Sequence, residues 1–305
     1  MTYRPARKIV VLALVALVGA TVALTYPGFS AVAAVRRTTT TGPDCGAPVA
    51  KTLFKKWVCT FADDFTGSAL DPAKWTAITT AMTGVTAGGG AACYVDTPDN
   101  IAVGGGYLTL TAREEAAPFV CHSPKGDYTT QYSSGQVATY GRFFQSYGRF
   151  AVRAKFPLTT ISGLQSSLWM WPESPLATGT VGEIDIAEWY SYLPDRVVPF
   201  AHYLYNPATT NIATGTNVPT KNTCVISDVS AFHDYVVQWT SSILTFSYDG
   251  QTCLTDHYQT YGTNPFAQPY FIALSQALGL SPNNFYPGVT PLPATTTIDW
   301  VRAWK

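Results

Sequence analysis

Hydrophobic and polar residues alternate with a period of two in many short segments of this chain. These segments are also rich in β-branched and aromatic residues, and a period of two is typical of a strand with one buried face. The sequence therefore predicts many short strands, clearest at Tyr107–Ala112, Gly148–Ala154, Tyr235–Trp239, Leu244–Tyr248 and Thr297–Trp304.

Turn-forming residues separate the predicted strands, as at Gly104–Gly106, Pro157, Pro172 and Asp249–Gly250. Tyr248-Asp-Gly250, between two strand-like runs, predicts a tight hairpin. No stretch keeps apolar residues three and four positions apart for long enough to predict a long helix. We therefore expect an all-β fold of two sheets packed face to face.

The N-terminal segment has a different pattern. Arg4, Arg7 and Lys8 precede an uncharged apolar run from Ile9 to about Thr25, and the small-residue pattern Ala31-Val-Ala33 follows it. This order predicts a secretory signal peptide over residues 1–33. Because the run approaches the roughly 20 residues that span a bilayer, an uncleaved membrane anchor with the rest of the chain outside is the alternative.

A short polar linker is predicted over residues 34–44, which include Arg36-Arg37 and Thr38 to Thr41. No repeat, charge block or shift in composition interrupts residues 45–305, and all-β domains of about 200–250 residues are common. We therefore expect one exported, monomeric domain over residues 45–305.

Cysteine usage agrees with export. No cysteine belongs to a CxxC motif or lies in a Cys/His cluster, so the six predict three disulfides rather than a metal or redox site. Six cysteines allow 15 pairings, and Cys224 with Cys253 is one sequence-local option among them. The six are Cys45, Cys59, Cys93, Cys121, Cys224 and Cys253.

Composition narrows the class of ligand. Charged residues make up 12% of the chain, the net charge is zero and aromatic residues reach 13%. Nucleic-acid binding requires a basic surface, so we exclude it. A neutral, aromatic-rich chain suits an uncharged ligand with apolar faces, such as a neutral polysaccharide, although most of the rings are expected in the core.

The candidate chemistry lies in the segment Gly182-Glu-Ile-Asp-Ile-Ala-Glu188. The chain has five glutamates, and two of them flank Asp185 in this apolar segment. On a strand Glu183 and Asp185 share a face, and a β-bulge near Ile186-Ala187 would bring Glu188 to it. Retaining glycosidases use two carboxyls about 5–5.5 Å apart as nucleophile and acid/base, and clustered carboxyls keep one proton near neutral pH. A solvated strand edge is the non-catalytic alternative.

Large aromatic rings lie beside these acids in the sequence. Trp169-Met-Trp171 precedes them and Trp189-Tyr190 follows them. Such rings can stack on the faces of sugars, although any one of them is more often a packing residue.

The segment Gly182–Glu188 resembles the signature of glycoside hydrolase family 16 in its bulged, laminarinase-like form. The resemblance implies a β-jelly-roll sandwich of two antiparallel sheets with a concave substrate cleft. It also implies Glu183 as nucleophile, Glu188 as acid/base and Asp185 as the residue that assists the pair. Collinear matches support it along nearly the whole exported chain, among them Phe61–Phe65, Tyr147–Arg153, His202-Tyr203, Phe232–Trp239 and Ile298–Arg302.

Two departures from the family pattern concern the substrate. The usual Trp-Pro-Ala-x-Trp run is Gln165-Ser-Ser-Leu-Trp169 here, and the usual Asn-Leu-Ala-Val-Gly run is Ser275-Gln-Ala-Leu-Gly279. His202 is a further candidate, although a lone histidine is as often a core residue. The candidate substrate-binding residues are therefore Gln165, Trp169, Trp171, Trp189, His202 and Gln276.

Asp299 stands where some family members hold a structural Ca²⁺ ion. One carboxylate cannot by itself make a site that needs six to eight oxygen ligands, and catalysis itself needs no cofactor.

The sequence thus predicts a secreted, endo-acting, retaining β-glycosidase that hydrolyses a neutral polysaccharide, with β-1,3- or β-1,3(1,4)-glucan as the expected substrate. A non-catalytic β-glucan-binding protein and a transglycosylase are the alternatives.

Overall fold

The computed structural model describes residues 42–174, 182–204, 224–260 and 262–305. The predicted signal peptide and most of the predicted linker lie outside the described residues, so the division into signal peptide, linker and domain stays a prediction. No helix in the described ranges is long and apolar enough to cross a membrane.

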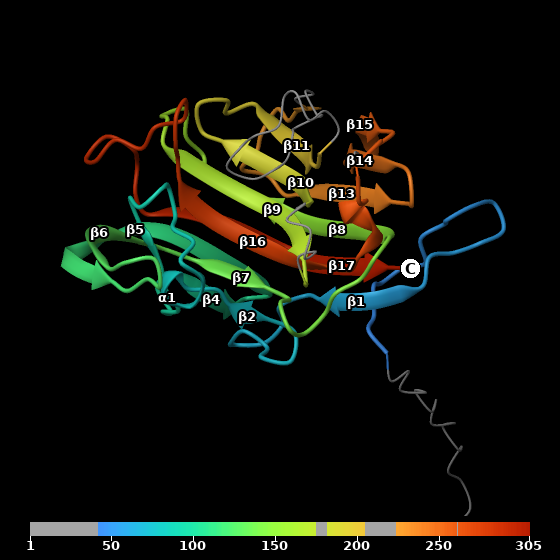
Figure 1. Ribbon diagram of the computed structural model, residues 1–305, viewed down its shortest axis with the longest axis horizontal. Coiled ribbons are helices and arrows are strands. Elements are labelled where there is room, and N and C mark those ends of the chain that lie inside the picture. The colour runs from blue at the N-terminus through green and yellow to red at the C-terminus, as the bar shows by residue number, and fades with distance from the viewer. Residues whose placement is uncertain (1–41, 175–181, 205–223, 261) are drawn as a thin grey trace, which may run out of the picture. The chain divides into compact units, whose positions relative to one another are not determined.

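The domain consists of two β-sheets that pack against each other, as predicted (Figure 1). The ten-stranded sheet has the order β15 (Gln251–Asp256), β14 (Leu244–Tyr248), β13 (His233–Trp239), β8 (Gly148–Lys155), β17 (Ala294–Trp304), β5 (Tyr107–Cys121), β6 (Tyr128–Ser134) and β3 (Cys93–Tyr94). In addition, β1 (Cys59–Asp63) pairs with β17, and β4 (Ile101–Gly104) pairs with β5.

The seven-stranded sheet carries the candidate acids. Its order is β12 (Cys224–Val225), β11 (Arg196–His202), β10 (Glu183–Tyr190), β9 (Leu164–Pro172), β16 (Tyr270–Leu278), β7 (Gln136–Ala138) and β2 (Thr76–Ala77). The strands pair antiparallel, with the exception of the short parallel pair β3 and β6 in the other sheet. The described helices are α1 (Thr80–Thr83) and the 3-10 helix η2 (Pro265–Ala267).

The main core lies between the two sheets. Phe150 and Val237 of the ten-stranded sheet and Leu168, Ile184 and Leu274 of the seven-stranded sheet are fully buried in one cluster. Each of these strands contributes every second residue to the core, so the opposite face of β9, β10 and β16 is free to carry polar chemistry.

Two local predictions are confirmed. Asp249 and Gly250 both have positive φ, 48° and 80°, and they join β14 to β15 as a tight hairpin. All six cysteines pair, as Cys45–Cys59, Cys93–Cys121 and Cys224–Cys253. The last of these links β12 at the edge of one sheet to β15 at the edge of the other.

Candidate active site

Strand β10 contains the predicted bulge. Asp185 pairs with Trp169 of β9, but Ala187 already pairs with Leu168, so Ile186 is an extra residue in the ladder. Ile186 and Ala187 are both fully buried. Glu188 therefore returns to the face that carries Asp185, because its partner Ser167 lies two residues from Trp169 on the regular strand β9.

A tyrosine from the opposite sheet holds the bulge. The hydroxyl of Tyr248, in β14, donates a hydrogen bond of 3.0 Å to the backbone carbonyl of Ile186. Tyr248 is buried, and an unpaired carbonyl at this depth would cost free energy. The sequence pattern indicated only that Tyr248 precedes a hairpin, because its partner lies 62 residues away.

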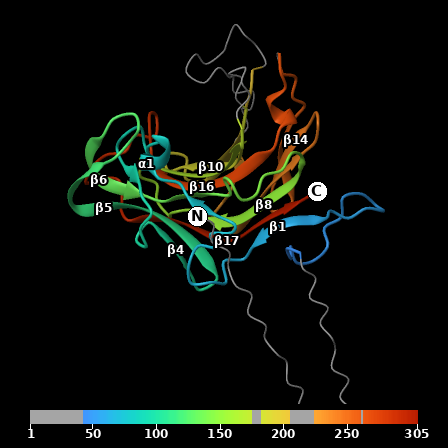
Figure 2. The same cartoon turned by 60° about the horizontal axis from the view of Figure 1, so that its bottom comes forward.

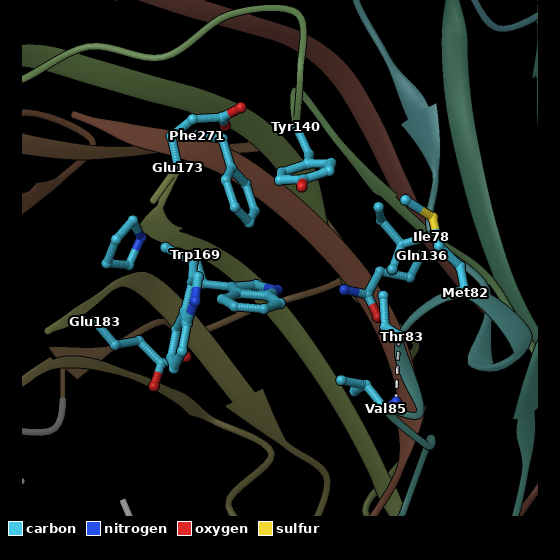
Figure 3. Close-up of a pocket in the computed structure, with 12 residues that line it drawn as sticks. Ile78, Met82, Thr83, Val85, Gln136, Tyr140, Trp169, Glu173, Glu183 and Phe271 are labelled. Atoms are coloured by element: carbon cyan, nitrogen blue, oxygen red, sulfur yellow. Dashed lines mark hydrogen bonds between the residues drawn. The ribbon is translucent and has the colours of Figure 1, made fainter. Parts of the chain in front are cut away.

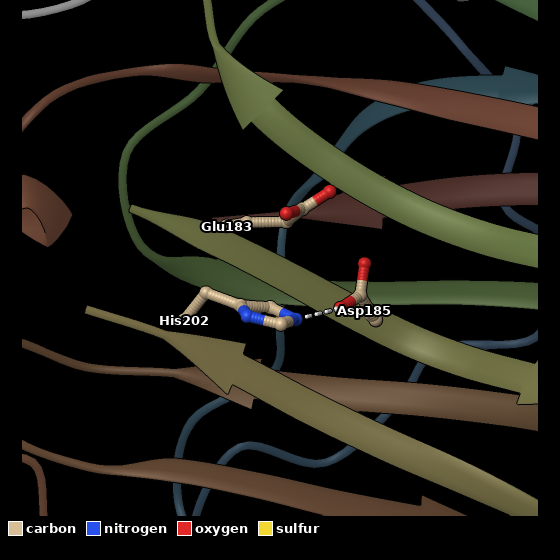
Figure 4. A group of neighbouring side chains, drawn as sticks. All are labelled: Glu183, Asp185 and His202. Atoms are coloured by element: carbon tan, nitrogen blue, oxygen red, sulfur yellow. Dashed lines mark ion pairs between the residues drawn. The ribbon is translucent and has the colours of Figure 1, made fainter. Parts of the chain in front are cut away.

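Glu183, Asp185 and His202 form a compact group (Figure 4). One side-chain ligand atom of each lies within 4.8 Å of those of the others. His202 lies opposite Glu183 in the ladder between β10 and β11, and its Nε2 is 3.0 Å from Oδ2 of Asp185. The predicted candidate His202 thus contacts one of the candidate catalytic carboxylates.

Burial and charge crowding disfavour ionisation of the two inner acids. Burial raises the pKa of Glu183 well above its ordinary value, and the charge of Asp185 raises it further, whereas His202 opposes the shift. Burial also raises the pKa of Asp185, and the charge of Glu188 adds to the effect. Glu183 and Asp185 therefore hold on to a proton at a higher pH than isolated carboxyls do.

Three donors surround the carboxylate of Glu188. Its Oε1 accepts hydrogen bonds from Nε2 of Gln165 at 2.9 Å and from Oγ of Ser167 at 2.7 Å. Its Oε2 accepts one from the Tyr190 hydroxyl at 2.5 Å. Burial and the charge of Glu188 raise the pKa of Tyr190, so this hydroxyl keeps its proton. Gln165, which stands where the family pattern has a tryptophan, therefore donates an amide hydrogen bond to Glu188, the candidate acid/base.

Sequence reasoning missed Ser167 and Tyr190 as site residues. Both could have been found from alternation, because Ser167 lies two residues before Trp169 and Tyr190 lies two residues after Glu188. Gln165 and Tyr190 also face each other across the β9–β10 ladder.

A pocket of about 510 Å³ opens beside Glu183 (Figure 3). Its aromatic wall comprises Trp169, Trp171, Tyr140 and Phe271, and the two tryptophan rings meet edge to face, with centroids 6.2 Å apart. The predicted candidates Trp169 and Trp171 thus both line it. No lysine or arginine is among the described residues that line this pocket.

A second acid, Glu173, also lines this pocket. Its Oε1 accepts a hydrogen bond of 3.1 Å from the backbone N–H of Gly141. Its Oε2 is buried without a partner among the described residues, and burial raises the pKa of Glu173.

Two predicted substrate-binding residues face the core instead. Trp189 is fully buried and stacks on Phe156 with ring centroids 6.1 Å apart. Gln276 is also fully buried, and its Oε1 accepts hydrogen bonds from the hydroxyls of Ser166 and Thr296 at 2.9 and 2.7 Å. Both assignments to the substrate are wrong, because these residues alternate with the cleft-facing ones on β10 and β16.

Asp299, the candidate calcium ligand, contacts an arginine. Nε of Arg153 is 3.1 Å from Oδ2 of Asp299, so a cation already balances this carboxylate. In the described part of the chain, Glu183, Asp185 and His202 are the one group of three or more candidate metal-ligating side chains. Structural calcium at Asp299 stays a prediction.

The sequence of this chain is similar to proteins of one known family. Residues 92–302 match the glycosyl hydrolases family 16. The glucan endo-1,3-beta-glucosidase A1 of Niallia circulans is 29% identical over 264 residues, which are 80% of this chain and 37% of that protein. The beta-glucanase of Rhodothermus marinus is 29% identical over 222 residues, 68% of this chain and 71% of that protein. The match therefore spans well under half of the first relative.

A solved structure has the same fold. The laminarinase from Rhodothermus marinus is 26% identical to this chain and superposes with a TM-score of 0.64, over 82% of this chain and 97% of that one.

Proposed function

We propose that this chain, which belongs to family 16 of the glycosyl hydrolases, is an exported, retaining endo-β-glucanase that cleaves β-1,3- or β-1,3(1,4)-glucan. The observation that carries the proposal is the bulge at Ile186, which brings Glu183, Asp185 and Glu188 to one face of β10 beside an aromatic pocket. Export rests on the N-terminal sequence pattern, and the β-glucan substrate and internal cleavage rest on the activities named for the relatives.

The first step is attack by Glu183 on the anomeric carbon of the sugar. The bond from that carbon to the glycosidic oxygen breaks, and Glu188 gives its proton to the departing oxygen. Glu183 must be ionised for this attack. His202 lowers the pKa of Glu183 and lies 3.0 Å from Asp185, so it offsets the negative charge that would otherwise oppose ionisation.

The second step returns the proton. Glu188 takes a proton from water, the water oxygen bonds to the anomeric carbon, and the ester bond to Glu183 breaks. Two inversions leave the product with the β configuration of the substrate.

The contacts of Glu188 suit both of its protonation states. An amide N–H of Gln165 can only donate, and it is bonded to Oε1, so Oε1 remains an acceptor. The Tyr190 hydroxyl at Oε2 can turn from donor to acceptor. We therefore assign the catalytic proton to Oε2, where Tyr190 can follow its transfer without a change in heavy-atom positions.

The charge of the pocket favours a neutral glycan. Glu183 and Glu173 line it, with no lysine or arginine among its described lining residues. A sulfate or carboxylate group on the sugar would lie close to these acids without a counter-charge. Aromatic walls supply stacking surfaces for the apolar faces of sugar rings instead.

Incubation with laminarin tests the function. Wild-type protein is expected to release reducing ends, whereas the Glu183→Gln variant is expected to release none. Early-time NMR should show the β anomer as the first product, and α product would exclude double displacement. Binding of laminarin without any release would instead indicate a non-catalytic glucan-binding protein, and products longer than the substrate would indicate transglycosylation.

A further inference from the structure

A hairpin-like loop projects from the domain immediately before β1, away from the sheets (Figures 1 and 2). We call this loop, residues 46–58, the finger. Ala50 and Lys56 form an antiparallel bridge within it, and the N–H of Trp57 donates to the carbonyl of Val49 at 2.9 Å. The finger is therefore an ordered, hydrogen-bonded loop.

Its base is anchored to the ten-stranded sheet. The Cys45–Cys59 disulfide closes the loop, and Val58 exchanges two backbone hydrogen bonds with Lys305, of 3.0 and 2.8 Å. Trp57 packs on a small buried cluster that includes Trp304. These constraints hold the finger at one place on the domain, so its tip is presented in a defined direction.

The tip exposes two consecutive apolar side chains. Leu53 is 95% exposed and Phe54 96% exposed, the highest values among the large hydrophobic residues of the described chain. Single exposed apolar residues are common on soluble proteins and need no explanation. Two adjacent ones at the apex of a loop do need one. Oγ1 of Thr52 accepts hydrogen bonds from the N–H groups of Phe54 and Lys55, so the turn satisfies its own backbone and leaves the two side chains outward.

Positive charge surrounds the tip. Lys51, Lys55 and Lys56 are exposed, and none of the three forms an ion pair with the residues that the structure describes. Residues 46–58 contain no acidic residue, although the whole chain has a net charge of zero. The finger thus concentrates three positive charges directly behind an apolar apex.

We propose that the finger docks the domain on an anionic lipid bilayer. Leu53 and Phe54 would enter the boundary between headgroups and acyl chains, while the three lysines reach the lipid phosphates with their extended stems. An apolar insertion combined with a basic patch is the pairing that makes peripheral attachment effective. A glucan chain fits the tip less well, because Phe54 is the one flat ring at the apex and the three lysines have no anionic group to bind on a neutral glucan.

The finger and the candidate catalytic acids belong to different sheets. The finger precedes β1 of the ten-stranded sheet, whereas Glu183 and Glu188 belong to β10 of the seven-stranded sheet. The proposal is therefore independent of the proposed hydrolase activity, and its test needs no substrate.

Vesicle co-sedimentation tests it with residues 42–305, which contain both sheets and all three disulfides in one compact unit. Vesicles of phosphatidylcholine with phosphatidylglycerol are compared with phosphatidylcholine alone. We expect binding to the mixed vesicles at low salt, at least about tenfold weaker for Leu53→Ser/Phe54→Ser. The triple change Lys51→Ala/Lys55→Ala/Lys56→Ala should weaken it on the order of a hundredfold.

A matched control alters two apolar residues elsewhere. Leu158 and Val289 are 80% and 61% exposed, and Leu158→Ser/Val289→Ser should bind as the wild type does. Unchanged melting temperatures would show that all variants are folded. The proposal falls if the serine variant of the tip binds like the wild type, if the control loses as much binding, or if neutral vesicles bind equally well. It also falls if the wild type does not bind the vesicles and the tip substitutions instead abolish self-association. The same holds if they abolish retention on insoluble glucan.

Discussion

Replacing Glu183 with glutamine should abolish turnover and at the same time stabilise the protein at neutral pH. No hydrogen bond to the Glu183 carboxylate is found among the described residues, whereas burial and the charge of Asp185 raise its pKa. Ionisation of this carboxylate therefore lowers the free energy of unfolding. The proposed reaction nevertheless requires the ionised form. Glutamine has nearly the same shape and carries no charge, so it removes the repulsion without opening a cavity.

The expected gain follows from the geometry. Unit charges at most 4.8 Å apart repel by about 3.5 kcal/mol at an effective dielectric constant near 20. Proton uptake limits the cost, because each pH unit between the ordinary pKa of 4.5 and pH 7 is worth about 1.4 kcal/mol. Because the positive charge of His202 opposes this repulsion, we take about half of it, a gain of about 2 kcal/mol, or roughly 4–8 °C in Tm for a domain of this size.

The sign of the effect depends on pH. A carboxyl whose folded-state pKa is raised contributes its full stability below its ordinary pKa and loses it as the pH rises through the folded-state value. Wild-type protein therefore loses this contribution as the pH rises from about 4 through the raised pKa of Glu183, whereas the Glu183→Gln variant does not. The advantage of the variant should appear at pH 7 and vanish near pH 4.

Scanning calorimetry at the two pH values measures this difference, and reducing-end release from laminarin measures the loss of activity, expected to be on the order of 10⁴-fold for a missing nucleophile. Glu188→Gln is the matched control. Its carboxylate accepts three hydrogen bonds that offset the cost of its charge, and an amide keeps them by donating to the Tyr190 hydroxyl, so Tm should rise less than in Glu183→Gln. A lower Tm for Glu183→Gln at pH 7, or an equal gain at both pH values, would refute the reasoning.

Four further substitutions test other contacts of the site. Glu188→Ala should block turnover of unactivated glucan, and azide should partly restore release from substrates with good leaving groups; equal residual activity with and without azide would contradict its role. Tyr190→Phe removes the donor to Oε2 of Glu188, so kcat should fall about tenfold with little change in KM, as steady-state kinetics would show. Tyr248→Phe leaves the bulge carbonyl unpaired, and denaturant unfolding should show a loss of about 1–3 kcal/mol; unchanged stability would mean that the carbonyl finds another donor. Asp185→Asn removes a charge that raises the pKa of Glu183, so the acid limb of kcat/KM should move to lower pH, and a shift to higher pH would contradict the electrostatic argument.

Much of the fold could be predicted because strand formation is local. The period of two and the turn residues predicted the strands around Tyr107, Gly148, Tyr235 and Leu244, and the structure has strands at each of these places. The Asp249-Gly250 turn depends on the backbone preferences of two neighbouring residues.

The grouping of the three candidate acids could also be predicted from the sequence. Three acids in one apolar strand are costly, and a spacing of two between Glu183 and Asp185 is enough to place them on one face. Only the resemblance to a family, however, proposes which glutamate is the nucleophile and which the acid/base, because the two glutamates are chemically alike.

Contacts between strands required the tertiary structure. Trp189 and Gln276 lie beside cleft residues in the sequence, yet both are buried on the opposite face. The donors to Glu188 and the tyrosine that holds the bulge come from pairings between residues up to 62 positions apart. Composition and periodicity report which way a side chain points along its own strand. They do not report which strand lies beside it, because register and sheet order are set by the burial of the whole core.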